Sequence, residues 1–239
     1  MRAPAKLTVS LRVTGVRADG YHLLESEMVA IDLADELEFD PDGDGLELIG
    51  ATGLDVPTTD DNLVRRALRA VGRTAHVTLR KRIPAGAGLG GGSADAAAVL
   101  RWAGRGDDVE LAATLGADVP FCLAGGGRAL VRGIGDELQP LPFVDRTYTL
   151  LVPPFGVSTV AVYRAWDALG GPTGGAGVND LEPAALHVEP RLTEWRDRLA
   201  DAAGARPTLA GSGGTWFVEG EFPGDDRIVT RTVPEDEIG

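Results

Sequence analysis

The sequence contains a single cysteine, Cys122, and only three histidines among its 239 residues. One cysteine cannot form an internal disulfide bond, which is typical of proteins from reducing compartments. His22, His76 and His187 are far apart in the sequence, and Cys122 has no partner at the spacing of zinc ligands. The composition therefore argues against a disulfide scaffold and against a transition-metal site.

Basic residues are also scarce. The 23 Lys and Arg residues face 36 Asp and Glu residues, which gives a net charge of -13. Nucleic acids and anionic membranes attract basic surfaces, so we expect neither as a partner. No apolar run approaches membrane-spanning length, and charges at Arg2, Lys6 and Arg12 interrupt any targeting signal at the start. We therefore expect a cytoplasmic protein, either a monomer or a weak homodimer.

Lysine is the rarest charged residue, since only Lys6 and Lys81 are lysines among the 23 basic residues. The lysine ammonium is a compact point charge suited to a phosphate oxygen, whereas arginine presents a planar fork. Each lysine is therefore a candidate functional residue. The alternative is that both are ordinary solvated side chains.

Hydrophobic periodicity and turn residues predict a mixture of strands and helices, and hence an α+β architecture. Residues 6–13 alternate apolar and polar side chains, as in a half-buried strand with Lys6 on its polar face. Further strands are predicted at 28–33, 36–39, 46–49, 76–80, 128–132 and 147–152 and within 209–219, with a hairpin loop at 41–45. Helices are predicted at 63–71, 94–103, 109–115, 159–169 and 189–203. Pro153-Pro154 predicts a boundary between domains of residues 1–150 and 151–239.

Five glycines occupy the seven positions from Gly86 to Gly92. Without side chains, backbone N–H groups can surround an anion. Ser93 is predicted to cap the following helix, whose positive end would then point into the loop. We interpret the segment as a phosphate cradle rather than a flexible linker. It is neither a Rossmann loop, since no second strand with an acidic end follows, nor a Walker loop, since no Gly-Lys-Ser/Thr closes it.

The segment from Pro84 to Ser93 resembles the ATP-phosphate loop of the GHMP kinases. Within this superfamily, residues 4–8 and 15–22 are similar to the N-terminal motifs of the 4-diphosphocytidyl-2-C-methyl-D-erythritol kinases. Residues 115–120, 156–159, 179–182 and 209–214 agree with the later motifs of that family, in the same order. The resemblance covers residues 3 to 219.

The resemblance implies a two-domain α+β fold with an N-terminal ATP-binding domain, a smaller C-terminal substrate domain and the active site in the cleft between them. It also implies transfer of the γ-phosphoryl group of ATP, with Mg²⁺, to the 2-hydroxyl of a cytidine-diphosphate-linked methylerythritol. This reaction belongs to the methylerythritol phosphate pathway of isoprenoid synthesis. The expected partner is thus a small molecule.

Matching positions give the implied roles. Asp118 would be the general base and Lys6 the charge stabiliser; the alternative for Asp118 is a turn or helix-cap residue. The resemblance assigns ATP binding to Asn62, Leu63, Lys81, Pro84, Gly86, Gly88, Leu89, Gly90, Gly91, Gly92, Ser93 and Ala94. It assigns substrate binding to Thr8, Tyr21, His22, Thr159 and Tyr163, with Tyr21, His22 and Tyr163 around the cytosine.

Some features depart from the family pattern. Thr8 replaces the usual asparagine, which puts one substrate hydrogen bond in doubt. The segment after Glu219 is short and is expected to lack a closing helix and strand. Two other functions stay open: a GHMP kinase for another alcohol, such as homoserine or mevalonate, and a nonenzymatic sensor that binds nucleotide and ligand. Tyr21-His22 argues against the first, and the retained Lys6 and Asp118 argue against the second.

Overall fold

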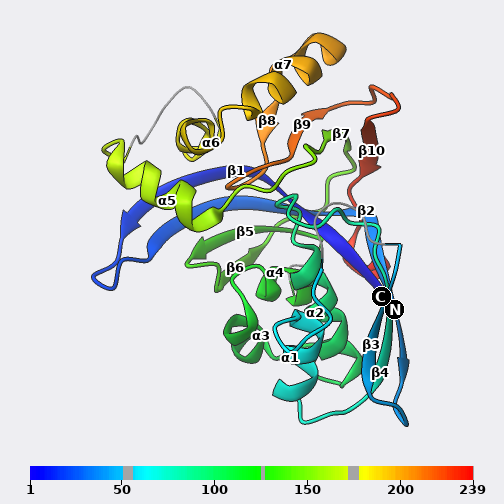
Figure 1. Cartoon of the computed structure of the whole chain (residues 1–239). Helices are drawn as coiled ribbons and strands as arrows, with labels where there is room; N and C mark the ends of the chain where they lie inside the picture. Colours follow the sequence, from blue (N-terminus) through cyan, green and yellow to red (C-terminus); the bar gives the residue numbers. More distant parts are fainter. Residues whose placement is uncertain (51–55, 125–126, 172–177, 239) are drawn as a thin grey trace.

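The computed structural model describes residues 1–50, 56–124, 127–171 and 178–238. These residues form two sheets with flanking helices, which confirms the predicted α+β class (Figure 1). The six-stranded sheet comprises β1 (Arg2–Val16), β2 (His22–Asp40), β3 (Gly45–Ile49), β4 (His76–Arg80), β5 (Arg128–Gly133) and β6 (Glu137–Pro140). Its order is β3-β4-β2-β5-β6, and β1 pairs with β2. The second sheet has the order β10-β7-β9-β8, from β7 (Thr147–Leu151), β8 (Thr208–Leu209), β9 (Trp216–Glu219) and β10 (Arg227–Arg231).

The β1–β2 hairpin is the longest feature of the fold and runs between the two halves of the molecule in Figure 1. The strands predicted at 28–33 and 36–39 are both parts of β2. The prediction of a half-buried strand holds only from Val9 onward, because residues 3–8 of β1 are all buried. Helix α2 (Gly91–Trp102) packs against β1, and the Lys6 N–H donates to the Leu89 carbonyl of the glycine loop. Lys6 and Thr8 therefore face the interior rather than solvent.

The predicted hairpin loop at 41–45 is wrong. Residues 41 and 42 do form a turn, but β3 pairs in parallel with β4 instead of returning along β2. β4 lies between them and pairs antiparallel with β2. Turn residues mark where the chain reverses, whereas the choice of neighbouring strand depends on a segment thirty residues further on.

The helices fall into two groups (Figure 1). The first group packs with the six-stranded sheet and contains α1 (Leu63–Ala70), α2, α3 (Val109–Leu115) and α4 (Val119–Ala124). The second packs with the four-stranded sheet and contains α5 (Thr159–Ala168), α6 (Glu182–Val188) and α7 (Leu192–Ala203). The sequence patterns did not predict α4 and α6, because both are short and α6 has no capping side chain such as Asp108 at the start of α3.

The chain after Glu219 contains a strand, so the expectation that it lacks one is wrong. β10 pairs antiparallel with β7, and the Thr230 hydroxyl donates to Asp32 of β2. A short 3₁₀ turn, Glu235–Glu237, follows. The second sheet starts at Thr147, close to the expected domain boundary, although the division at residue 150 itself stays a prediction.

Candidate active site

The glycine loop lines a cavity of about 290 Å³ at the start of α2. Of the residues predicted to bind ATP, this cavity brings together Asn62, Leu63, Lys81, Pro84, Gly86, Gly88, Leu89, Gly90, Gly91 and Gly92. Ser93 and Ala94 are not in its lining. Ala94 belongs instead to the hydrophobic core beneath the helix.

The predicted cap at Ser93 is wrong. Helix α2 begins at Gly91, and its N-cap is Gly90, which has a left-handed φ of 69° and makes no side-chain hydrogen bond. Ser93 is the third residue of the helix. Only glycine adopts this backbone without strain, and the absence of a capping side chain leaves the first N–H groups of the helix open to a ligand. The start of α2 can therefore bind an anion as predicted, but Gly90 and not Ser93 forms its N-cap.

A second glycine-rich turn, residues 211–214, holds the loop from the other side. A Cβ atom on Gly88 would lie 2.5 Å from the Gly213 carbonyl oxygen. The Thr215 hydroxyl donates to the Ala87 carbonyl at 2.7 Å, and its N–H donates to the same oxygen at 3.3 Å. The two turns come from opposite halves of the chain, so their contact fixes the loop relative to the second sheet.

Lys6 and Asp118 form an ion pair beside this loop. Lys6 Nζ lies 3.2 Å from Asp118 Oδ2 and donates to Thr8 Oγ1 at 3.1 Å. Its aliphatic stem lies directly against Gly90, since a Cβ atom there would be 2.7 Å from Lys6 Cγ. The lysine is only 6% exposed, whereas the Asp118 side chain keeps 32% of its surface accessible. A cation is therefore held between a phosphate-type loop and a carboxylate that solvent or a ligand can reach.

Lys81 has a different environment. Its ammonium contacts Asp35 and lies 2.9 Å from Asp95 Oδ2. Burial lowers the pKa of Lys81, but the charges of Asp95 and Asp35 outweigh burial, and the net shift is upward. Burial raises the pKa of Asp95 to about 7; Lys81 lowers it only in part, and the charge of Asp35 raises it further. Asp95 Oδ1 is buried without a hydrogen-bond partner in the described structure, and both Lys81 and Asp95 line the cavity.

His22 lies against helix α5. Its Nε2 is 2.8 Å from Asp167 Oδ1, its ring packs on Tyr163 with centroids 4.7 Å apart, and Trp166 meets it edge-on at 5.4 Å. Burial raises the pKa of Tyr163, and the charge of Asp118 raises it further. The aromatic cluster therefore lies within electrostatic reach of the Lys6–Asp118 pair.

Of the other three residues predicted to bind substrate, Thr8 lies at Lys6, and Tyr21 and Thr159 lie apart from the aromatic cluster. Tyr21 is 61% exposed and shares no ring contact with Tyr163 among the aromatic pairs of the described residues, so the structure shows His22 and not Tyr21 on Tyr163. Thr159 starts α5 and its hydroxyl lies 2.9 Å from the Ser212 hydroxyl of the second glycine turn.

Sequence reasoning missed three acidic residues of this region, Asp35, Asp95 and Asp167. Asp95 offered a signal, because it is the one charge within the alanine-rich stretch 94–98. Asp35 offered no clear signal, because it is one of several acidic residues in β2 and only the fold shows that it is buried. Asp167 offered no local signal, since its partner His22 is 145 residues away.

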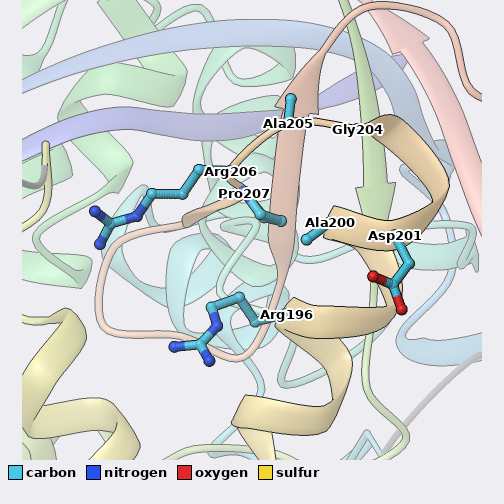
Figure 2. Close-up of a pocket in the computed structure, with 7 residues that line it drawn as sticks. All are labelled: Arg196, Ala200, Asp201, Gly204, Ala205, Arg206 and Pro207. Atoms are coloured by element: carbon cyan, nitrogen blue, oxygen red, sulfur yellow. The ribbon is translucent and has the colours of Figure 1, made fainter.

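A larger surface hollow of about 450 Å³ lies elsewhere, between the end of α7 and β8. Figure 2 shows Arg196 and Arg206 extending to the same side of it. Arg206 Nη2 lies 3.2 Å from Glu182 Oε1, and Arg196 pairs with Asp197. None of the predicted site residues lines this hollow. Size alone does not make it the site, and the chemistry gathers at the glycine loop.

Known proteins resemble this chain over most of its length. Residues 62–126 match the family GHMP kinases N terminal domain. A 4-diphosphocytidyl-2-C-methyl-D-erythritol kinase of Pelotomaculum thermopropionicum is 41% identical, with 90% of this chain and 86% of that protein covered. The one from Moorella thermoacetica is 39% identical, with 98% and 95% covered. This chain belongs to the 4-diphosphocytidyl-2-C-methyl-D-erythritol kinase family.

The fold agrees with this family. A crystal structure described as 4-(cytidine 5'-diphospho)-2C-methyl-D-erythritol kinase superposes with a TM-score of 0.77 at 35% identity, covering 98% of this chain and all of that one. The predicted GHMP kinase fold and the predicted family are therefore confirmed. Within the described residues, no group of three His, Cys, Asp or Glu side chains is placed to hold a metal ion. Nor does the described part of the chain contain a helix with the length and apolar character needed to cross a membrane.

Proposed function

We propose that this chain transfers the γ-phosphoryl group of ATP to the 2-hydroxyl of 4-diphosphocytidyl-2-C-methyl-D-erythritol. The observation that carries the proposal is the Lys6–Asp118 pair, 3.2 Å apart, with the lysine stem packed against Gly90 of the glycine loop. A phosphoryl donor in that loop would present its terminal phosphate beside a cation and a carboxylate. The names of the relatives supply the acceptor alcohol.

Phosphoryl transfer depends on positioning and on stabilisation of negative charge. Asp118 is the general base, because its accessible carboxylate can accept the proton of the attacking hydroxyl. Lys6 holds Asp118 in place and stabilises the charge that develops on the transferred group. The open N–H groups at the start of α2 hold the phosphates. Mg²⁺ is expected to enter with ATP, bound mainly through phosphate oxygens, and to neutralise part of their charge.

The nucleotide and acceptor sites follow from the two sides of the Lys6–Asp118 pair. Asn62, Leu63 and Lys81 line the cavity beyond the loop, where we place the nucleoside of ATP. His22 and Tyr163 do not line that cavity but lie within electrostatic reach of Asp118, and there we place the cytosine of the acceptor. Tyr21, exposed at the tip of the hairpin, closes over the base from solvent. Thr8, Thr159 and Ser212 complete this side with hydroxyl groups.

A coupled assay of ATP consumption tests the function. The panel contains 4-diphosphocytidyl-2-C-methyl-D-erythritol, homoserine and mevalonate, and phosphorus NMR of the product identifies the phosphorylated hydroxyl. We expect turnover with the cytidylyl substrate and a monophosphate on its 2-hydroxyl. Faster turnover of homoserine or mevalonate would replace this substrate by another alcohol. Nucleotide and ligand binding without turnover would favour the sensor.

A further inference from the structure

Three side chains of α5 hold the His22 ring. Tyr163 covers one face, Trp166 meets the ring edge-on, and Asp167 binds the Nε2 atom at 2.8 Å. These residues are spaced i, i+3 and i+4 and so share one side of the helix. The His22 side chain keeps only 10% of its surface exposed, and that of Asp167 keeps 51%. The ring is therefore fixed, while its carboxylate partner stays at the surface.

The partner atom decides which nitrogen of a neutral imidazole carries the proton. An ionised carboxylate has no hydrogen to give, so Nε2 must be the donor in the His22–Asp167 hydrogen bond. In the neutral ring the other nitrogen, Nδ1, is then an acceptor. Asp167 thus determines the hydrogen-bonding character of the one ring nitrogen that it does not touch.

Whether His22 Nδ1 accepts or donates a hydrogen bond matters for the recognition of a pyrimidine. Cytosine and uracil have similar shapes and stack equally on an aromatic ring, but cytosine carries a 4-amino donor where uracil carries a 4-oxo acceptor. An acceptor nitrogen pairs with the amino group and faces the oxo group with a second lone pair. A buried polar atom left without its partner destabilises the complex.

We propose that Asp167 is a positioning residue for base specificity: by holding the proton on His22 Nε2, it leaves Nδ1 to accept from the 4-amino group of cytosine and to reject uracil. This inference rests on the proposed function, because it takes the cytidylyl group of the acceptor as the ligand of His22. It adds a residue that acts through His22 and touches neither ATP nor the reacting hydroxyl.

The test compares kcat/KM for the cytidine-linked and uridine-linked forms of the methylerythritol substrate. The wild type should prefer the cytidine form by roughly tenfold to hundredfold, the range expected for one unpaired buried group. Asp167→Ala removes the carboxylate that holds the proton on His22 Nε2. Asp167→Asn offers an amide N–H that can donate to Nε2 and move the proton to Nδ1. Both variants should lose most of the preference, and the second should shift furthest toward uridine.

Two further readouts separate positioning from a structural role. Both variants should keep the wild-type KM for ATP, and ¹⁵N NMR should show His22 as the Nε2–H tautomer in the wild type and not in Asp167→Asn. Asp197→Asn is the matched control, because Asp197 is similarly exposed and pairs with Arg196 away from His22. It should leave both the preference and the tautomer unchanged.

The outcomes are distinguishable. Equal use of both pyrimidines by the wild type, or an unchanged preference in both Asp167 variants, would overturn the role of Asp167 and leave the kinase function standing. An Nδ1–H tautomer in the wild type would do the same. Absence of turnover with the cytidine-linked substrate would overturn the proposed function and this inference with it.

Discussion

The buried Asp95 makes the stability of the fold depend on pH. This carboxylate is 3% exposed, shares the Lys81 ammonium with Asp35 and has one oxygen without a hydrogen-bond partner among the residues that the structure describes. Three ionised groups there carry a net negative charge in a buried environment. We predict that Asp95→Asn, which keeps the shape and removes the charge, stabilises the protein at alkaline pH.

The magnitude follows from the pKa. Asp95 rises from an ordinary value of 3.8 to about 7. A shift of about 3 units corresponds to about 4 kcal/mol. The unfolded chain releases this proton near pH 4, whereas the folded protein keeps it up to about pH 7. Stability from this group is thus complete below pH 4 and is lost as the pH rises to 7, and about 2–3 kcal/mol of it falls between pH 5 and pH 8.

Urea unfolding at pH 5 and at pH 8 provides the measurement. The free energy of unfolding of Asp95→Asn minus that of the wild type should increase by about 2–3 kcal/mol from pH 5 to pH 8. Taking the difference cancels other titrating groups and any constant cost of the amide. Asp107→Asn is the matched control, because it removes the same charge from an exposed aspartate away from Lys81.

One result would refute the reasoning. If the difference between Asp95→Asn and the wild type is the same at both pH values, Asp95 is ionised in the folded protein throughout this range. The charge of Lys81 would then lower the pKa of Asp95 by more than burial and the charge of Asp35 raise it.

Three further predictions concern the site. Asp118→Asn should retain ATP binding but lower kcat by roughly a hundredfold or more, the usual contribution of a general base, and near-normal turnover in the folded variant would contradict that role. Gly88→Ala should lower the free energy of unfolding by more than the roughly 1–2 kcal/mol of a left-handed alanine, because its Cβ atom meets the Gly213 carbonyl at 2.5 Å. In thermal or urea melts, Gly104→Ala, with a similar φ of +75° and open space around it, should lower the free energy of unfolding only by the cost of the left-handed backbone. Equal losses in the two variants would mean that the two glycine turns do not press on each other. Tyr21→Ala should weaken binding of the cytidylyl substrate by roughly 1–3 kcal/mol in calorimetry while ATP affinity stays constant; an unchanged substrate affinity would remove Tyr21 from the base site.

Features encoded by adjacent residues could be predicted from the sequence. The glycine loop, the helix after it and helix α3 depend on residues a few positions apart. The alternation of residues 6–13 predicted the strand β1 but not the burial of Lys6 within it. Even here one detail was wrong, because a serine before an alanine-rich helix favours a side-chain cap. At this end, the left-handed Gly90 starts the helix earlier and leaves its N–H groups open.

Features that depend on distant pairing could not be predicted in this way. β3 lies beside β4 because β4 inserts next to β2, and β10 joins the second sheet through the distant β7, where Arg227 pairs with Leu151 and Arg231 with Thr147. The same reason hid the partners of the site residues. A lysine in the sequence shows no sign of whether one carboxylate or two will meet it, so Lys6 with Asp118 and Lys81 with Asp35 and Asp95 became distinct only in the fold.

The β1–β2 hairpin has a consequence for cooperativity. Its side chains enter all three hydrophobic clusters: Met28 in the first, Leu11 and Val13 in the second, and Leu7 and Ile31 in the third. A fragment that begins after the expected domain boundary would lose these side chains and expose the core of its own sheet. The two halves therefore share one folding unit, and calorimetry of the whole chain should show a single melting transition rather than two.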